Sequence, residues 1–233
     1  MEGLLPEWLK VSDDWRYGFP GAAVGFLAMH GVANPSSHPL LEEKKRNLEG
    51  ILRDRHGSQR VDPASQAVLA AYRGYYKRFK KTYHVELQLK SLVSQAKPIP
   101  QVAALVEAAF MAELKNLLLT AAHDLDAVSM PLVLGSSKGG ERYGLLRGQD
   151  QELKPKDMMM SDAMGVICSV IYGSDWRTRI TAATRRVLFV TYVPPGVDVS
   201  HVVQHLRDID NNVRLVSPGA GTDFLEAVVA GGG

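Results

Sequence analysis

A nine-residue segment of the sequence, residues 73–81, carries five positive charges and three aromatic residues but no acid. At helical spacing, four of its cations share one face: Arg73, Lys77, Lys80 and Lys81. Such a face suits contact with phosphates, and an exposed tyrosine would stack on an unpaired base. The alternative is a solvated basic helix whose aromatic side chains face the protein core. The segment therefore predicts either a nucleic-acid contact or an ordinary surface helix.

Two carboxylates flank a leucine in the segment His123-Asp124-Leu125-Asp126, which follows a predicted long helix. Such a pair of acids can position a water molecule or bind an ammonium group, and the imidazole of His123 titrates near neutral pH. Asn116 and Thr120 precede the pair within two helical turns. Aspartates at a helix end also commonly cap backbone amides. A binding role and a purely local structural role are both open for this segment.

Three further polar motifs lie in the second half of the chain. Lys138-Gly139-Gly140-Glu141 would let backbone amides approach a phosphate or carboxylate, yet the same residues make a good hairpin turn, which the motif alone favours. Asp162 is interpreted as a turn acid before a buried strand. Arg177 and Arg179 alternate with threonines such as Thr178. Their planar donor forks suit a carboxylate, a phosphate or a ribose.

The composition excludes several classes of protein. Over 233 residues, 27 Lys plus Arg against 25 Asp plus Glu leave a net charge of +2, which excludes a wholly basic nucleic-acid binder but not a local basic patch. The single cysteine, Cys168, cannot form an internal disulfide and fits a reducing compartment. No apolar run approaches the roughly 20 residues that span a bilayer, and the first residues lack a signal-peptide pattern. We therefore expect a cytoplasmic protein without membrane contact.

No motif of the sequence requires a cofactor or a metal, and we predict neither. The 7 histidines do not show the spacing of zinc ligands. Neither a phosphate-binding glycine loop nor a nucleophile elbow occurs in its expected context. The motifs alone thus lead to an α+β domain with an anion site.

The elements that would position these motifs follow from periodicity and from Gly and Pro punctuation. Helices are predicted over 40–55, 64–80, 88–95, 101–119 and 199–210. Strands are predicted over 22–29, 130–134, 143–146, 164–171 and 187–193. Asp62 before Pro63 has the pattern of a helix N-cap, and the glycine-rich tail from Gly219 is expected to fray. A helical first half feeding a β-rich second half predicts the α+β class.

The order of these motifs resembles the B3/B4 domain family in its free-standing form, which is named for the tRNA-binding and editing domain in the β chain of phenylalanyl-tRNA synthetase. The resemblance spans about residues 70 to 195. It is carried by Arg73–Lys81, Asp124–Asp126, Lys138–Glu141, Asp162 with Gly165–Cys168, Arg177–Thr181 and Leu188–Val190. It implies a B3/B4-like α+β fold in residues 71–215, preceded by an α/β portion in 1–70 that packs on it. Residues 216–233 would then form a flexible glycine-rich tail.

The activity that the resemblance implies is hydrolysis of the ester between a wrong amino acid and tRNA, by a free-standing aminoacyl-tRNA deacylase. Lys138, Arg177 and Arg179 would hold the phosphate or ester region, Asp124 or Asp126 would bind the amino group, and His123, Asn116 and Thr178 would orient water. Glu141 and Asp162 would either join them or fix turns, while Arg73, Lys77, Lys80 and Lys81 would bind tRNA. The catalytic histidine of the family aligns with Ala121 or, after a two-residue shift, with His123.

Two other functions fit the same resemblance. A non-catalytic tRNA- or RNA-binding module would keep the fold without a competent site. An amino-acid-binding protein or small-molecule hydrolase would use the fold without tRNA, because a fold does not fix a function. The edited amino acid, the tRNA and the oligomeric state are open at this point.

Overall fold

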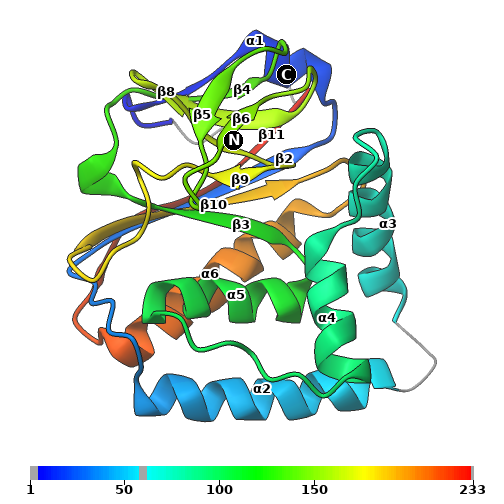
Figure 1. The fold of residues 1–233 in the computed structure, drawn as a ribbon, viewed down its shortest axis with the longest axis vertical. Helices are drawn as coiled ribbons and strands as arrows, with labels where there is room; N and C mark the ends of the chain where they lie inside the picture. Colours follow the sequence, from blue (N-terminus) through cyan, green and yellow to red (C-terminus); the bar gives the residue numbers. More distant parts are fainter. Residues whose placement is uncertain (1–4, 58–61, 232–233) are drawn as a thin grey trace.

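The computed structural model describes residues 5–57 and 62–231 (Figure 1). The helices are α1 (Asp13–Gly18), α2 (Pro39–Gly57), α3 (Pro63–Lys77), α4 (His84–Ser94), α5 (Ala104–Asn116) and α6 (Val199–Val216), with a 3-10 turn η1 (Leu125–Ala127). The strands are β1 (Leu9–Val11), β2 (Ala23–His30), β3 (Leu119–Asp124), β4 (Leu132–Ser136), β5 (Arg142–Gly144), β6 (Asp150–Glu152), β7 (Met158–Asp162), β8 (Gly165–Ser169), β9 (Gly173–Ser174), β10 (Arg186–Val193) and β11 (Gly221–Val229). The predicted α+β class is confirmed, and most of the helices come from the first half of the chain.

The strands form two main sheets and a short hairpin. One sheet has the order β1-β4-β7-β8-β9, the other has the order β11-β2-β10-β3, and β5 pairs with β6. Figure 1 shows the four-stranded sheet between the other strands and a layer of helices that contains α2, α5 and α6. The four-stranded sheet is thus covered on both faces.

Coverage on both faces explains why β2 and β10 are almost uninterrupted apolar runs. Leu27 of β2 and Phe189 of β10 pack with residues of α5 and α6 in one core cluster. Their sequence neighbours Phe26 and Val190 belong to the larger cluster on the opposite face. Alternation of side chains along each strand therefore supplies two separate cores.

Gly25 permits the close approach of α6 to the sheet. A Cβ atom at this position would lie 2.7 Å from Cγ1 of Val202 and 3.1 Å from Cδ1 of Leu206, both on α6. Real Cβ atoms essentially never lie within 3.0 Å of another atom, so a side chain at residue 25 would force Val202 and α6 to shift.

The predicted fraying of the tail is wrong for residues 221–229. They form β11, which pairs with β2 along its whole length, from Gly221 opposite His30 to Val229 opposite Ala23. The side chains of β11 are partly exposed, as is typical of an edge strand. The segment was predicted as a flexible tail because glycines flank it. Because β2 lies between β10 and β11, residues from both chain ends complete the sheet that carries β3.

The segment around His123 also differs from the prediction. Helix α5 ends at Asn116, three residues before the predicted end, where Leu117 adopts a left-handed conformation with φ of 60°. Leu119–Asp124 then form β3, a strand that was not predicted. The run Leu-Thr-Ala-Ala is a fair helix former, but pairing with β10 overrides this local preference. Asn116 and His123 therefore lie on different elements.

Candidate functional site

His123 lies near the end of β3 and points between the two sheets. It shares a strand face with Leu119 and Ala121, both in the core between the sheets, and its side chain is fully buried. Nδ1 of His123 lies 2.7 Å from Oγ1 of Thr178, whereas Nε2 has no hydrogen-bond partner among the described residues. Burial, with a smaller contribution from the charge of Arg177, lowers the pKa of His123 to about 4. The imidazole is therefore neutral at pH 7.

The partners of Thr178 fix which nitrogen of His123 carries the proton. The Thr178 hydroxyl donates to Oδ1 of Asp175, and the carboxylate can only accept. The hydroxyl has one proton, so it must accept a hydrogen bond from Nδ1 of His123. The proton of the neutral ring thus sits on Nδ1, and Nε2 presents an unused lone pair.

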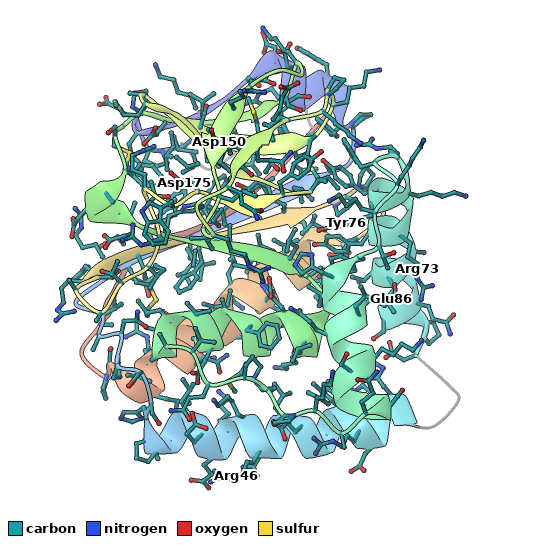
Figure 2. All side chains as sticks on the ribbon, in the orientation of Figure 1. Arg46, Arg73, Tyr76, Glu86, Asp150 and Asp175 are labelled. Atoms are coloured by element: carbon teal, nitrogen blue, oxygen red, sulfur yellow. The ribbon has the colours of Figure 1, made fainter. Side chains whose placement is uncertain are left out.

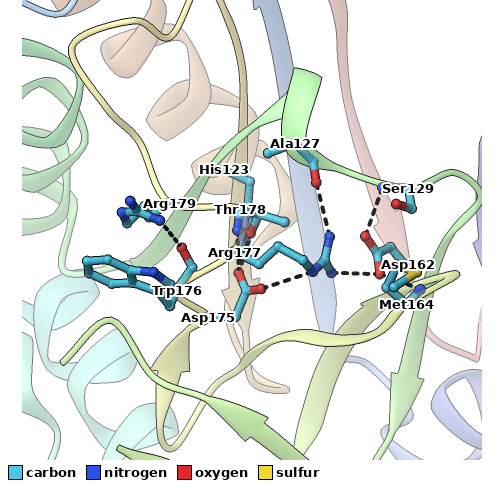
Figure 3. A network of polar contacts seen from close by, with 10 residues as sticks. All are labelled: His123, Ala127, Ser129, Asp162, Met164, Asp175, Trp176, Arg177, Thr178 and Arg179. Carbon is cyan, nitrogen blue, oxygen red and sulfur yellow. Dashed lines mark hydrogen bonds and ion pairs between the residues drawn. The ribbon is translucent and has the colours of Figure 1, made fainter. Parts of the chain in front are cut away.

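Arg177 supplies the positive charge beside this chain (Figure 3). Its Nη2 lies 2.8 Å from Oδ1 of Asp162, its Nε lies 3.8 Å from Oδ2 of Asp175, and its Nη1 donates to the Ala127 carbonyl at 3.0 Å. The Asp162 side chain is fully buried and also accepts from the backbone N–H of Ser129 at 2.8 Å. Two buried carboxylates therefore share one arginine.

We call these five residues, His123, Thr178, Asp175, Arg177 and Asp162, the buried network. Four of them were predicted site residues, and the structure brings them together from β3, β7 and the segment that follows β9. Asp175 was not among the predicted residues. Its signal was the spacing to Thr178, because an aspartate three residues before a threonine commonly caps its backbone N–H, here at 3.1 Å.

Asp124 and Asp126 lie beside the buried network but act locally. The Asp124 carboxylate accepts from the N–H of Asp126 at 3.0 Å and from the hydroxyl of Thr184 at 2.6 Å. Asp126 is exposed and lies 3.2 Å from Nη1 of Arg186. The alternative that these acids cap a turn accounts for the contact of Asp124 with the Asp126 N–H, whereas the contact with Thr184 ties the turn to the segment before β10.

Glu141 likewise closes the turn in which it lies. Its carboxylate accepts from the backbone N–H groups of Lys138 at 2.6 Å and Gly139 at 2.9 Å. Gly139 has φ of 94°, a conformation that suits glycine. These amides are thus already satisfied by a carboxylate, whereas the Lys138 side chain is exposed.

Arg179 lies outside the buried network, on the opposite side of Arg177 from Asp162 (Figure 3). Its guanidinium stacks 3.6 Å from the centre of the Trp176 ring and donates to the Trp176 carbonyl at 2.7 Å. It has no carboxylate partner among the described residues.

Asn116 is not part of this site. Its amide donates to Asp208 at 2.9 Å and lies 3.2 Å from Nδ1 of His205, on the helix side of the four-stranded sheet. Nε2 of His205 lies 2.7 Å from the hydroxyl of Thr120. Opposite faces of β3 therefore carry the two histidine clusters, since Thr120 and His123 alternate along the strand.

The predicted basic helix is shorter than expected. Helix α3 ends at Lys77, so Lys80 and Lys81 lie beyond it, and Lys80 has a left-handed backbone with φ of 57°. Arg73 forms a bidentate pair with Glu86 of α4, at 2.9 and 2.5 Å. Figure 2 labels these two neighbouring residues. Arg73 is therefore already compensated, and the four cations do not form one helical face.

Exposed cations from three segments meet beyond the end of α3 instead. Nη2 of Arg78 donates to the Lys156 carbonyl at 3.1 Å, and the Ser137 hydroxyl, next to Lys138, donates to the Lys154 carbonyl at 2.6 Å. We call this set the basic surface: Lys77, Arg78, Lys80, Lys81, Lys138, Lys154 and Lys156, all exposed. Within the described part of the chain, none of the seven forms an ion pair with a carboxylate. The sequence separation between 81 and 138 concealed this grouping.

The aromatic side chains of the basic segment face the core, as the second alternative predicted, so they are not exposed for stacking on an unpaired base. Tyr75 and Tyr76 are 4% and 2% exposed. The Tyr76 hydroxyl donates to the Val170 carbonyl at 3.0 Å, and the Tyr75 hydroxyl donates to Asp157 at 2.5 Å. Burial raises the pKa of Asp157 to about 6. The tyrosines therefore attach α3 to the strands.

Other chemistry of the described residues is limited. The buried Cys168 has a pKa raised by burial to about 12, so its thiol stays protonated. In residues 5–57 and 62–231, no three His, Cys, Asp or Glu side chains are grouped to hold a metal ion. No helix in these ranges has the length and apolar character needed to cross a bilayer.

Comparison with known proteins assigns the family. A family model described as the B3/4 domain matches residues 70–213, which is more than half of the chain. The chain belongs to the B3/4 domain family. The match contains every residue of the buried network and of the basic surface. Comparison with curated proteins gives no match.

Among solved structures, the chain is similar to an N-terminal fragment of the phenylalanyl-tRNA synthetase β-subunit from Pyrococcus horikoshii. The two share 12% sequence identity with a TM-score of 0.48, over 94% of this chain and 53% of that one. This B3/4 protein thus spans about half the length of that fragment.

Proposed function

We propose that this B3/4 protein hydrolyses the ester bond of aminoacyl-tRNA, as a free-standing deacylase. Membership in the B3/4 family supports the choice of substrate, together with the editing activity that the sequence resemblance implies. The observation that carries the chemistry is the unused Nε2 lone pair of a neutral His123.

In the proposed reaction, Nε2 of His123 accepts a proton from water as the water oxygen attacks the ester carbonyl. Thr178 and Asp175 keep the other ring proton on Nδ1 and stabilise the imidazolium that forms. The proton on Nε2 then passes to the leaving ribose oxygen, which gives a free amino acid and a tRNA hydroxyl. Because the pKa of His123 is about 4, the rate should fall only when the pH approaches that value.

One observation favours the second candidate, an RNA-binding module without turnover. His123 is fully buried and does not line the hollows described for this chain, so substrate would reach Nε2 only after neighbouring residues move. The basic surface would be sufficient for binding in that case.

A deacylation panel separates these functions. The full-length protein is incubated at low salt with tRNAs carrying correct or incorrect amino acids, and loss of ester is followed. The proposal expects turnover of one subset and a reduction of about 100-fold or more in His123→Gln. His201→Gln, at a partly exposed position on α6 outside the buried network and the basic surface, is the matched control and should keep full activity.

Other outcomes of the panel contradict the proposal. Salt-dependent retention of tRNA without turnover would establish the binding module. Stabilisation by a free amino acid without tRNA affinity would place the protein in the small-molecule class. Equal activity of wild type and His123→Gln would remove His123 from the reaction.

A further inference from the structure

Trp176 is half exposed although its backbone is held firmly. Its side chain is 51% exposed, while its N–H donates to the Gly144 carbonyl at 2.9 Å and its carbonyl accepts from Arg179 at 2.7 Å. Leu145 also forms a β-bridge with Asp175. Trp176 therefore presents its large apolar ring to solvent from a fixed position beside the buried network.

A hollow of about 400 Å³ lies between this ring and the β5–β6 turn. It is lined by Gly144, Leu146, Arg147, Gly148 and Trp176. Its volume falls in the range of about 300 to 1,000 Å³ that small-molecule sites occupy. Leu146 is 47% exposed, so two large apolar side chains face solvent beside the same space.

The turn that carries Leu146 and Arg147 is well ordered by backbone contacts. Leu145 and Gln149 are joined by an N–H to carbonyl bond of 2.8 Å, and Gly148 donates to the Leu145 carbonyl at 2.8 Å. Gly148 has φ of 75°, which a glycine adopts without strain. The hollow is therefore formed by fixed backbone on both sides.

The positive charge on the lining of the hollow favours a ligand with a negatively charged group. Arg147 is the one charged residue among those that line it, and it has no partner within residues 5–57 and 62–231. Arg179 stacks on the indole but does not line the hollow, so it contacts a different part of the ring. A hollow lined by an indole, an exposed leucine and one arginine matches a flat ring that carries a phosphate.

We propose that this hollow binds a nucleotide, with the base packed against Trp176 and Leu146 and the phosphate held by Arg147. The proposal rests on the proposed function to the extent that it places the 3′-terminal nucleotide of the tRNA beside the buried network. Any base can pack against the Trp176 ring, because every base has a flat aromatic face. The ionic contact with Arg147, in contrast, needs the phosphate group.

The test is a titration of the full-length protein with AMP, followed by tryptophan fluorescence. Trp15 is fully buried and Trp8 partly buried, so Trp176 is the indole most accessible to a ligand. Saturable quenching by AMP is expected, with about tenfold weaker binding in Arg147→Ala. Adenosine should bind more weakly than AMP and should be insensitive to Arg147→Ala. Calorimetry with Trp176→Ala should show binding weakened about tenfold or more.

Matched probes make the test decisive. Lys90→Ala, at an exposed position on α4, should bind AMP as wild type does. Ribose 5-phosphate, which lacks the base, should not quench the tryptophan fluorescence. Absence of saturable quenching, equal binding by Arg147→Ala, or tighter binding of phenylalaninamide than of AMP would each overturn the proposal. AMP binding in a protein that leaves every aminoacyl ester intact would refute the deacylase and keep the nucleotide site.

Discussion

The buried network and the basic surface are both rich in charged side chains, but only the buried network pairs its charges within the protein. In the buried network, Asp162 and Asp175 are buried and share the guanidinium of Arg177. In the basic surface, seven exposed cations have no carboxylate partner among the described residues. One region pairs its charges internally, with one arginine between two carboxylates, and the other leaves its charge to solvent.

This difference follows from the cost of burying charge. An unpaired charge between two sheets would cost several kcal/mol, so the network must contain its own counter-charges. An exposed lysine remains hydrated and costs almost nothing without a partner. Substitutions in the buried network should therefore change folding stability, whereas substitutions in the basic surface should change binding.

Arg177→Ala should have the largest effect on stability. It leaves two buried carboxylates without a cation, and we expect the free energy of unfolding to fall by about 3 kcal/mol in urea denaturation. Arg179→Ala, two residues away, removes an arginine that contacts a carbonyl and an exposed ring, and should cost under about 1 kcal/mol. Equal losses in the two variants would show that Arg177 does not compensate the aspartates.

Thr178→Val should have the next largest effect. Valine keeps the shape but removes the hydroxyl that joins His123 to Asp175, and leaves the buried Nδ1–H of His123 without an acceptor. The Asp175 carboxylate still accepts from the backbone N–H of residue 178. We expect a loss of about 2 kcal/mol in the free energy of unfolding. Thr178→Ser retains the hydroxyl and should recover most of this loss. A valine variant as stable as the serine variant would contradict the hydrogen-bonded chain.

His123→Gln tests the buried network through pH. In the folded protein burial lowers the pKa of His123 to about 4, whereas the ordinary value is 6.5. Between these values the unfolded chain binds the proton and the folded chain does not, so stability falls as pH drops from 6.5 to 4. Wild type should therefore lose stability relative to His123→Gln in this window, and the two should run parallel above it.

The comparison with His123→Gln cancels other titrations. Burial lowers the pKa of His205 to about 3 and raises that of Glu113 to about 8, and both groups are present in both proteins. Thermal unfolding at a series of pH values measures the difference. Parallel curves from pH 6.5 down to 4 would mean that folding does not lower the pKa of His123.

The sequence predicted elements where local pattern and tertiary structure agree. Asp62 does cap α3, with Oδ1 accepting from the Ser65 N–H at 2.8 Å, and the β-branched run over 187–193 does form β10. The prediction failed for β3, which was not recognised as a strand, and for β11, which was expected to be a frayed tail. Pairing with β10 and β2 determines both strands, and a local window of sequence does not contain these partners.

For the candidate site, the sequence indicated residue types but not their partners. His123, Asp162 and the pair Arg177 and Thr178 were predicted from three separate motifs, and the fold joins them into one network. The same reasoning missed that Asp175 completes it, and it placed Asn116 with His123 although the two lie on opposite sides of a sheet. Their functional roles stay predictions.

The basic surface should give the smallest effect on stability and a distinct effect on binding. Lys77→Ala with Lys156→Ala removes two exposed cations without carboxylate partners, so the free energy of unfolding should change by no more than about 0.5 kcal/mol. If both contact phosphates, the salt dependence of tRNA binding should become shallower by about one unit of log–log slope for each lysine. Lys90→Ala is the control for loss of an exposed lysine elsewhere. A slope unchanged in the double variant would mean that these two lysines do not contact the RNA. Cations without carboxylate partners would then be insufficient to identify the RNA-binding face, although such a face needs them.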